Sequence, residues 1–456
     1  MTTRWLAVLA GPVIGAIAAF AASGALEPAA VATIGVAVWT AVWWLTEAVE
    51  IGFASLVPLA MLPMFGAATT EDVARGVGHD LVLLLLSGFL LSTSLEDVGA
   101  HRQLALRVTR AIGGRSGRAV LWGFLVATTF VSMWISNSAA TLMMMPVARA
   151  VLDAYPDRRL DAPLVLAIAY GASVGGLGTP IGSPPNLVFV EAWARETGEP
   201  FGFFAWMRLG IPLVVLLTSA LGLWLGRGLA GTPPAEVPDP GPWTSGQRRA
   251  LSLFAVVAVL WATRTDPWGG WSAWWPFGKT SDASVGLLGV LVLGLSTDRE
   301  GERLLSWSSV QRIPWGSILL FGSGIALANA MEKSGLSAEV AAGFGSLEGV
   351  PVIALIPMVA AGVTLLSEVA SNTAAAVLLM PVLAEAARVL ETPPGPLMFT
   401  GVLAASCGFM LPVATAPNAI AHGTGLVSTR RMALEGLVVD AMGVAAVTVV
   451  CWWGFA

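Results

Sequence analysis

Long apolar stretches recur along the whole chain and alternate with short polar connections. They approach the roughly 20 residues that a helix needs to cross the hydrocarbon core of a bilayer. Because they are spread over the full length, the pattern predicts a polytopic, all-α membrane protein. Only Arg4 precedes the first stretch, which lacks a convincing cleavage site, so we interpret it as a spanning helix and not a signal peptide. Representative stretches are residues 5–25, 31–45, 81–95, 209–225 and 437–453.

The composition agrees with this interpretation and argues against several functions. Hydrophobic residues make up 56% of the chain and charged residues 12%, whereas soluble domains contain about 25% charged residues. Cys407 and Cys451 lie in apolar stretches and indicate buried thiols, and three histidines argue against a zinc site. No basic cluster is interleaved with aromatic residues, as nucleic-acid binding would require. No metal cluster or Ser-His or Ser-Lys dyad stands out, so we do not expect an enzyme or an organic cofactor.

Two halves of the sequence match at four landmarks in the same order. The offset between the copies stays between 232 and 236 residues. Such a long period predicts two large structural repeats and not a solenoid array. The matched segments are 87–99 with 323–335, 136–140 with 371–375, 145–147 with 380–382, and 185–186 with 417–418.

Charges place the matching loops of the two repeats on opposite sides of the membrane. The first loop carries five arginines and no acid, whereas the second carries one lysine and two glutamates. By the positive-inside rule the first loop is cytoplasmic and the second external. The repeats are therefore predicted to have inverted topology, as in many secondary transporters, with a cytoplasmic N-terminus in the inner (plasma) membrane of the cell. The residues are Arg102, Arg107, Arg110, Arg115 and Arg118 in the first loop, and Lys333, Glu339 and Glu348 in the second.

We expect about 11 transmembrane helices, two re-entrant hairpins and two broken helices. Prolines between residues 232 and 247 indicate a linker between the halves. The predicted parts are N-terminal scaffold helices (1–78), repeat 1 (79–230), a cytoplasmic linker (231–248), scaffold helices with an interfacial helix (249–314) and repeat 2 (315–456). The hairpins are expected at about 116–155 and 337–392, and the broken helices at about 161–197 and 396–427.

Each Ser-Asn motif is predicted to be the turn of a re-entrant hairpin. The apolar runs that flank Ser136, residues 121–135 and 139–151, are each too short to cross comfortably. Ser, Asn and Thr are preferred N-caps, so each turn can begin the following helix. Such a helix directs free N–H groups and the positive end of its dipole toward the middle of the membrane.

Proline-rich segments at 178–186 and 411–418 are predicted to break two further helices, because proline removes a donor and clashes with the preceding turn. The freed carbonyls, with Ser and Thr hydroxyls and Asn amides, are the hard oxygens that sodium prefers. Neither the two turns nor the two breaks contain a charged residue. Hydroxyls, amides, helix N-termini and bound sodium would all favour an oxyanion such as a carboxylate.

Paired Ser-Asn-Ser/Thr motifs, each followed by a proline-broken helix that ends in Pro-Asn, resemble the divalent-anion:sodium symporter family of dicarboxylate, citrate and sulfate transporters. The resemblance extends from about Val31 to the end of the chain. It implies a homodimer with an elevator mechanism, in which a transport domain moves against a scaffold domain. It implies two or more sodium ions, one held by Ser132, Ser136, Asn137 and Gly182 and another by Ser367, Ala370, Ser371, Asn372 and Ala414. It places the substrate at Ser136, Asn137, Ser138, Ser183, Ser371, Asn372, Thr373 and Thr415.

Two positions depart from the family pattern and leave the substrate open. Ser138 stands where the family usually has Thr, which enlarges the pocket by a methyl group. Ala416 replaces the second proline that many dicarboxylate carriers have. Ser132 and Ser367, one helical turn before each motif, favour sodium coupling over the sodium-independent exchangers of the family. Glu368 is interpreted either as a residue with a salt-bridge or rim role or as a proton- or sodium-binding group.

The sequence thus predicts a secondary transporter that imports a C4-type dicarboxylate, of the succinate, malate and fumarate class, by sodium symport. A sodium-independent dicarboxylate exchanger and a carrier of citrate or sulfate remain alternatives. An anion channel is a further alternative from a different class of protein. The partners expected are a small oxyanion, the lipid bilayer and a second copy of the chain.

Overall fold

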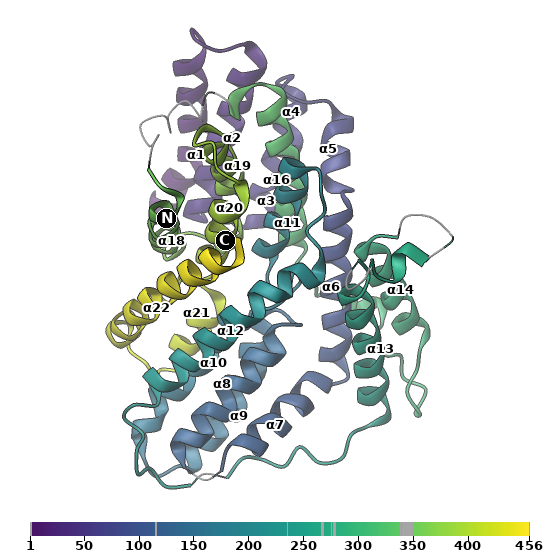
Figure 1. Ribbon diagram of the computed structural model, residues 1–456, viewed down its shortest axis with the longest axis vertical. Helices are drawn as coiled ribbons and strands as arrows, with labels where there is room; N and C mark the ends of the chain where they lie inside the picture. The colour runs from purple at the N-terminus through teal and green to yellow at the C-terminus, as the bar shows by residue number, and fades with distance from the viewer. Residues whose placement is uncertain are drawn as a thin grey trace.

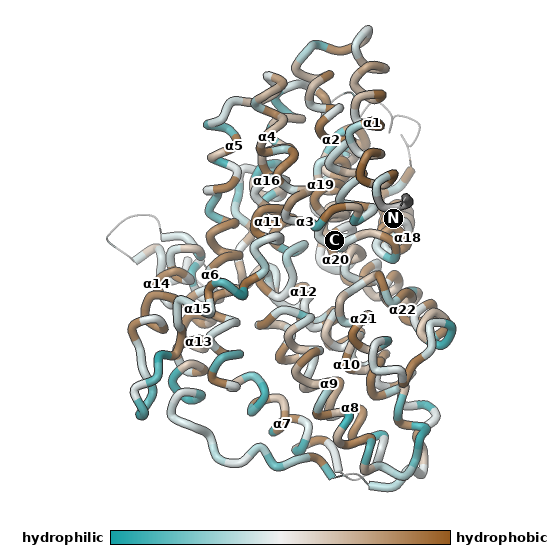
Figure 2. The backbone as a smooth tube through the Cα atoms, turned by 180° about the vertical axis from the view of Figure 1, so that it is seen from behind, coloured by the Kyte–Doolittle hydropathy of each residue, from teal (hydrophilic) through white to brown (hydrophobic). Residues whose placement is uncertain are grey.

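The computed structural model describes residues 2–114, 116–234, 236–265, 269–274, 276, 280–337, 339 and 350–455. Within these residues the protein is helical, with one isolated β-bridge between Thr297 and Arg303, which confirms the all-α prediction for the described part. Six of the described helices are long and apolar enough to cross a membrane, and five shorter helices are also apolar. Large side chains such as Phe20, Leu295 and Trp453 are exposed, and hydrophobic colour runs along most helices in Figure 2. Lipid would cover such surfaces in a membrane protein.

The first six helices are α1 (Thr2–Ala22), α2 (Pro28–Thr46), α3 (Ile51–Ala54), α4 (Leu56–Met64), α5 (Thr70–Val77) and α6 (Asp80–Asp97). Helices α1 and α2 form an antiparallel pair at one end of the molecule (Figure 1). A Cβ atom on Gly15 would lie 2.6 Å from the Gly35 carbonyl oxygen, so the two backbones touch there. Small residues permit this kind of close contact between membrane helices.

The next segment contains a helical hairpin and a broken helix. Its elements are α7 (Ala100–Ile112), α8 (Gly117–Ser132), α9 (Asn137–Ala154), the 3-10 turn η1 (Arg158–Leu160), α10 (Asp161–Gly175), α11 (Pro184–Thr197) and α12 (Phe203–Leu225). Helices α8 and α9 lie in the lower half of Figure 1, and α10 packs against both. The helices end and begin again at the Ser-Asn turn and at the proline-rich segment.

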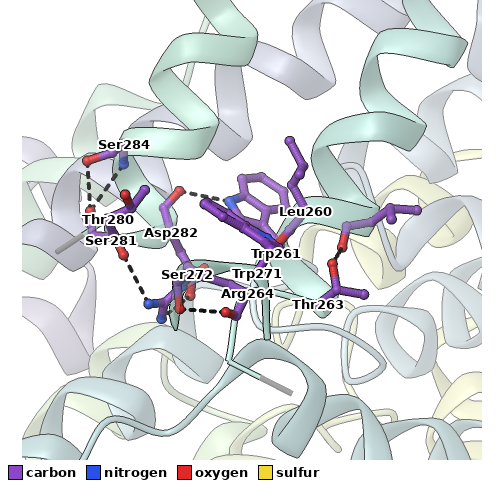
Figure 3. Close-up of polar contacts among 11 residues, drawn as sticks. Leu260, Trp261, Thr263, Arg264, Trp271, Ser272, Thr280, Ser281, Asp282 and Ser284 are labelled. Atoms are coloured by element: carbon purple, nitrogen blue, oxygen red, sulfur yellow. Dashed lines mark hydrogen bonds and ion pairs between the residues drawn. The ribbon is translucent and has the colours of Figure 1, made fainter. Parts of the chain in front are cut away.

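The middle of the chain contains α13 (Ser245–Ala262), the 3-10 turn η2 (Trp271–Trp274), α14 (Asp282–Leu295) and α15 (Trp307–Val310). An ion pair between Arg264 and Asp282 joins the end of α13 to the start of α14 (Figure 3). The Trp261 indole also donates to the Asp282 carbonyl at 2.8 Å. The helix expected along the inner interface before residue 314 is only the single turn α15, because Pro314 follows closely and limits its extension.

The last helices are α16 (Trp315–Lys333), α18 (Val352–Ser367), α19 (Asn372–Val389), α20 (Pro394–Ala405), α21 (Ala416–Gly423) and α22 (Thr429–Phe455). Helices α18 and α19 lie in the upper half of Figure 1, opposite α8 and α9. Much of the stretch from 337 to 351, where the second hairpin was expected to begin, lies outside the described residues. Helix α16 packs against α2, α3, α4 and α5, and also contacts α19.

The second half of each broken helix packs against the hairpin of the other half of the chain. Helix α11 contacts α19, and α21 contacts α9. The first halves also pack within their own half of the chain, α10 on α8 and α9 and α20 on α18 and α19, and each contacts the second half of the other broken helix, α10 on α21 and α20 on α11. The two halves of the sequence are therefore interlocked through the helices that follow the breaks.

Candidate functional site

The first Ser-Asn turn is held by hydrogen bonds between a hairpin and a broken helix. The Ser132 hydroxyl lies 2.8 Å from Asn137 Oδ1 and 2.7 Å from the Ala172 carbonyl oxygen of α10. The Ser136 hydroxyl accepts from the backbone N–H of Ala139 at 3.2 Å and so caps α9. Serine is a favourable N-cap because it satisfies one of the free N–H groups of the first turn.

The second turn repeats this arrangement with one difference. The Ser367 hydroxyl lies 2.7 Å from Asn372 Oδ1 and 2.5 Å from the Ala405 carbonyl oxygen of α20. Ser371 occupies the N-cap position of α19, but its side chain makes no capping hydrogen bond. Its hydroxyl thus remains available to a ligand, whereas that of Ser136 is engaged.

Each helix break is held by the asparagine of its Pro-Asn pair, which had been predicted only as a landmark of the repeat. Asn186 Nδ2 donates to the carbonyl oxygens of Gly176 and Thr179 at 2.7 and 2.8 Å. Asn418 Nδ2 donates to those of Gly408 and Leu411 at 3.3 and 3.0 Å. Both asparagines are fully buried, and their Oδ1 atoms have no hydrogen-bond partner within the described residues. An unpaired buried oxygen is costly, so both breaks could accept a cation.

A glycine lies at the centre of each turn-and-break pair, Gly176 in the first and Gly408 in the second, and neither was among the predicted site residues. A Cβ atom on Gly176 would lie 2.6 Å from Asn137 Oδ1, and one on Gly182 would lie 2.6 Å from the Gly176 carbonyl oxygen. In the second half, a Cβ atom on Gly408 would lie 3.2 Å from the Ser367 carbonyl oxygen and 3.4 Å from Ala414 Cβ.

The structure therefore brings together two groups of predicted sodium ligands. Ser132, Asn137 and Gly182 gather around Gly176. Ser367, Asn372 and Ala414 gather around Gly408. Both groups offer hydroxyl, amide and carbonyl oxygens and no nitrogen or sulfur ligand, a donor set that fits sodium.

The predicted substrate residues are less uniformly placed. Those of the two turns are all half-buried: Ser136, Asn137, Ser138, Ser371, Asn372 and Thr373. Of these six, Ser371 and Thr373 line an open cleft of about 960 Å³. The residues of the first turn do not line it. Ser183 is buried, and Thr415 caps α21 by accepting from Asn418 N at 3.2 Å.

Two buried acids hold the second break, and one of them was missed in the sequence. The Glu368 carboxylate accepts from the backbone N–H groups of Met410 and Leu411, both at 2.8 Å. Asp440, on α22, accepts from Phe409 N at 3.0 Å. Glu368 therefore forms no salt bridge with another described residue, and its burial argues against a place at the rim; its carboxylate fixes the backbone next to Ser367. The signal for Asp440 was an acid within the long apolar stretch of α22, where ionisable residues are costly and usually functional.

Asp440→Ala and Glu368→Gln are each expected to lower the maximal transport rate at least about tenfold. Alanine leaves the buried N–H of Phe409 without its acceptor, and the glutamine amide directs a donor at one of the two backbone N–H groups that Glu368 binds. Asp153→Asn, which alters an exposed acid on α9, is the matched control. Initial rates in proteoliposomes, normalised to folded protein, measure the effect. Full activity in both break variants would show that these acids do not position the break.

Comparison with known proteins places the chain in a transporter family. The sequence profile of the citrate transporter family matches residues 41–391. The sodium-dependent dicarboxylate transporter SdcS of Staphylococcus saprophyticus is 31% identical over 456 residues, covering 94% of this chain and 86% of that protein. SdcS of Staphylococcus aureus is 31% identical over 448 residues, covering 92% and 85%.

Solved structures share the fold at low sequence identity. The YdaH transporter of Alcanivorax borkumensis superimposes with a TM-score of 0.60 at 16% identity, covering 84% of this chain and 87% of that one. MtrF of Neisseria gonorrhoeae gives a TM-score of 0.60 at 13% identity, covering 88% and 86%.

Apolar helices, interlocked breaks and these matches together define a multi-pass membrane transporter and not an enzyme. The chain belongs to the divalent-anion:sodium symporter family, as its paired motifs predicted.

Proposed function

We propose that this protein imports a C4-type dicarboxylate, of the succinate, malate and fumarate class, by sodium symport. The observation that carries the proposal is the pair of oxygen-only groups around Gly176 and Gly408, each beside the N-terminus of a helix. Helix N-termini attract anions, and the names of the SdcS relatives support both sodium and dicarboxylate. Bound sodium would supply the positive charge that the neutral turns lack.

In this proposal two sodium ions bind, one beside each Ser-Asn turn. Ser132, Ser136, Asn137 and Gly182 would hold one, and Ser367, Ala370, Ser371, Asn372 and Ala414 the other. The substrate carboxylates would meet the hydroxyls and amides of both turns, with Ser183 and Thr415 nearby. Because sodium makes the site attractive to an anion, binding of the two is expected to be cooperative.

We further propose the larger construction that the family resemblance implied: inverted repeats, a homodimer and an elevator movement. The hairpin of α8 and α9 in the lower half of Figure 1, that of α18 and α19 in its upper half, and the interlocked helices α9, α11, α19 and α21 support a transport domain built from both halves. Helices α1 to α5 and α13 to α15 would form the scaffold, apart from any contribution of the undescribed residues.

A citrate carrier is a second candidate, favoured by the citrate transporter profile and by Ser138, which lacks the methyl group of threonine. Uptake of radiolabelled succinate, citrate, 2-oxoglutarate and sulfate into proteoliposomes, with and without a sodium gradient, tests the proposal. Concentrative succinate uptake only with sodium is expected. Uptake that requires dicarboxylate inside the liposomes and ignores the sodium gradient would identify an exchanger. Uptake that internal dicarboxylate does not accelerate would identify a channel.

Thr373→Ala is expected to raise the half-saturating concentration of the dicarboxylate about tenfold, because the loss of one hydroxyl removes a hydrogen bond to a charged ligand. The sodium dependence should change little, since Thr373 is not among the proposed sodium ligands. Concentration series of initial uptake rates measure both quantities. An unchanged substrate constant would remove Thr373 from the site.

A further inference from the structure

The cleft of about 960 Å³ leads from the protein surface to the second Ser-Asn turn. Ser371 and Thr373 lie along it, together with the connection between α2 and α3 and the start of α16. Helices α2, α3 and α19 each contact α16, and the four helices lie in one region of Figure 1. In the proposed topology this end of α2 and of α16 is cytoplasmic, so the cleft is the path between the substrate site and the cell interior.

Two carboxylates and no cationic side chain line this path. Glu47 and Glu50 belong to the lining, and the lining contains no Lys, Arg or His. Both glutamates are exposed, and neither has an ion pair or side-chain hydrogen bond to another described residue. Glu47 also adopts a left-handed backbone conformation, with φ of 48°, which is uncommon for a residue other than glycine.

We infer that Glu47 and Glu50 form an electrostatic filter that makes the cytoplasmic face of the carrier a release face. This inference rests on the proposed function. A dianion that leaves Thr373 passes two unpaired negative charges, which repel it over the screening length of about 8 Å at physiological salt. The same charges attract sodium. The filter therefore weakens dicarboxylate binding and strengthens sodium binding from the cytoplasmic side.

The test compares the two faces of the membrane in the full-length protein. Inside-out vesicles report binding from the cytoplasmic face, and intact cells report binding from the external face. For E47Q/E50Q we expect the half-saturating succinate concentration at the cytoplasmic face to fall at least threefold and that of sodium to rise at least twofold. Both external constants should stay unchanged. A residue with a merely structural role would not move the two constants in opposite directions.

The matched control is E300Q/E302Q, which removes two exposed carboxylates from the connection between α14 and α15, outside the cleft. E47D/E50D, which retains the charges, should restore both wild-type constants. Unchanged cytoplasmic constants in a folded E47Q/E50Q, changes of the same sign, or an effect only at the external face would each overturn the filter. Absence of sodium-driven succinate uptake by the wild-type protein would instead refute the proposed function.

Discussion

Alanine in place of Asn137 is expected to lower sodium-dependent dicarboxylate uptake by about 100-fold while the protein still folds. The Asn137 amide bonds to Ser132 on the preceding helix, touches Gly176 in the break and is proposed to serve both sodium and substrate. Hydrogen bonds to charged partners contribute about 1.5–3 kcal/mol, and each 1.4 kcal/mol is a factor of ten. Loss of one such contact to each ligand accounts for the expected decrease.

Two further variants accompany Asn137→Ala: the equivalent substitution in the second turn, and a control substitution outside both turns. Asn372→Ala should cause a loss of similar size, because Asn372 makes the matching contact with Ser367. Asn329→Ala, which removes an amide from α16 away from either turn, should transport normally. Uptake in proteoliposomes, with thermal unfolding as the measure of folding, decides the outcome. Normal uptake by a folded Asn137→Ala protein would refute its assignment to the site.

Gly182→Ala is expected to raise the half-saturating sodium concentration at least about tenfold. The added Cβ atom would lie 2.6 Å from the backbone oxygen of Gly176, which is itself fixed by Asn186. The Gly176 backbone cannot rotate away from the new methyl group as a side chain could, so the segment between α10 and α11 must widen. Overpacking of this kind typically costs about 1–3 kcal/mol of stability. The oxygens around Gly176 would then separate, and a hard cation would lose ligands.

Gly178→Ala provides the contrast within the same break. Its Cβ atom would meet the terminal methyl group of Met133 at 2.7 Å, and a methionine side chain is flexible enough to move. We expect less than a threefold change in the sodium constant. Sodium titrations of succinate uptake for both variants measure the difference. Equal effects of the two substitutions would show that the contact between Gly182 and Gly176 does not organise the site.

The ends of the helices were predictable because their causes are local. Proline removes a backbone donor wherever it stands, and a Ser-Asn motif favours a helix start through its own hydroxyl. The structure accordingly ends α10 at Gly175 and begins α11 at Pro184, and it begins α9 and α19 at the two Ser-Asn motifs. The internal repeat also indicated which turn and break in the first half correspond to those in the second half, which a single motif could not do.

The contacts that assemble the site were not predictable, because they join residues distant in sequence. Asp440 reaches Phe409 only because α22 packs beside the second break. The closeness of Gly176 to Asn137 likewise depends on how α10 lies against the hairpin. Both turns also have serine at the N-cap position, yet only the side chain of Ser136 makes the capping hydrogen bond. The binding roles of the site residues stay predictions.

We propose that the two Ser-Asn turns form one site that sodium and a dicarboxylate fill together. An experimental structure determined with sodium and succinate tests this most directly. We expect succinate between the turns of Asn137 and Asn372, with a sodium ion beside Gly176 and another beside Gly408. Succinate bound elsewhere, or an unoccupied space between the two asparagines at saturating sodium and succinate, would contradict it.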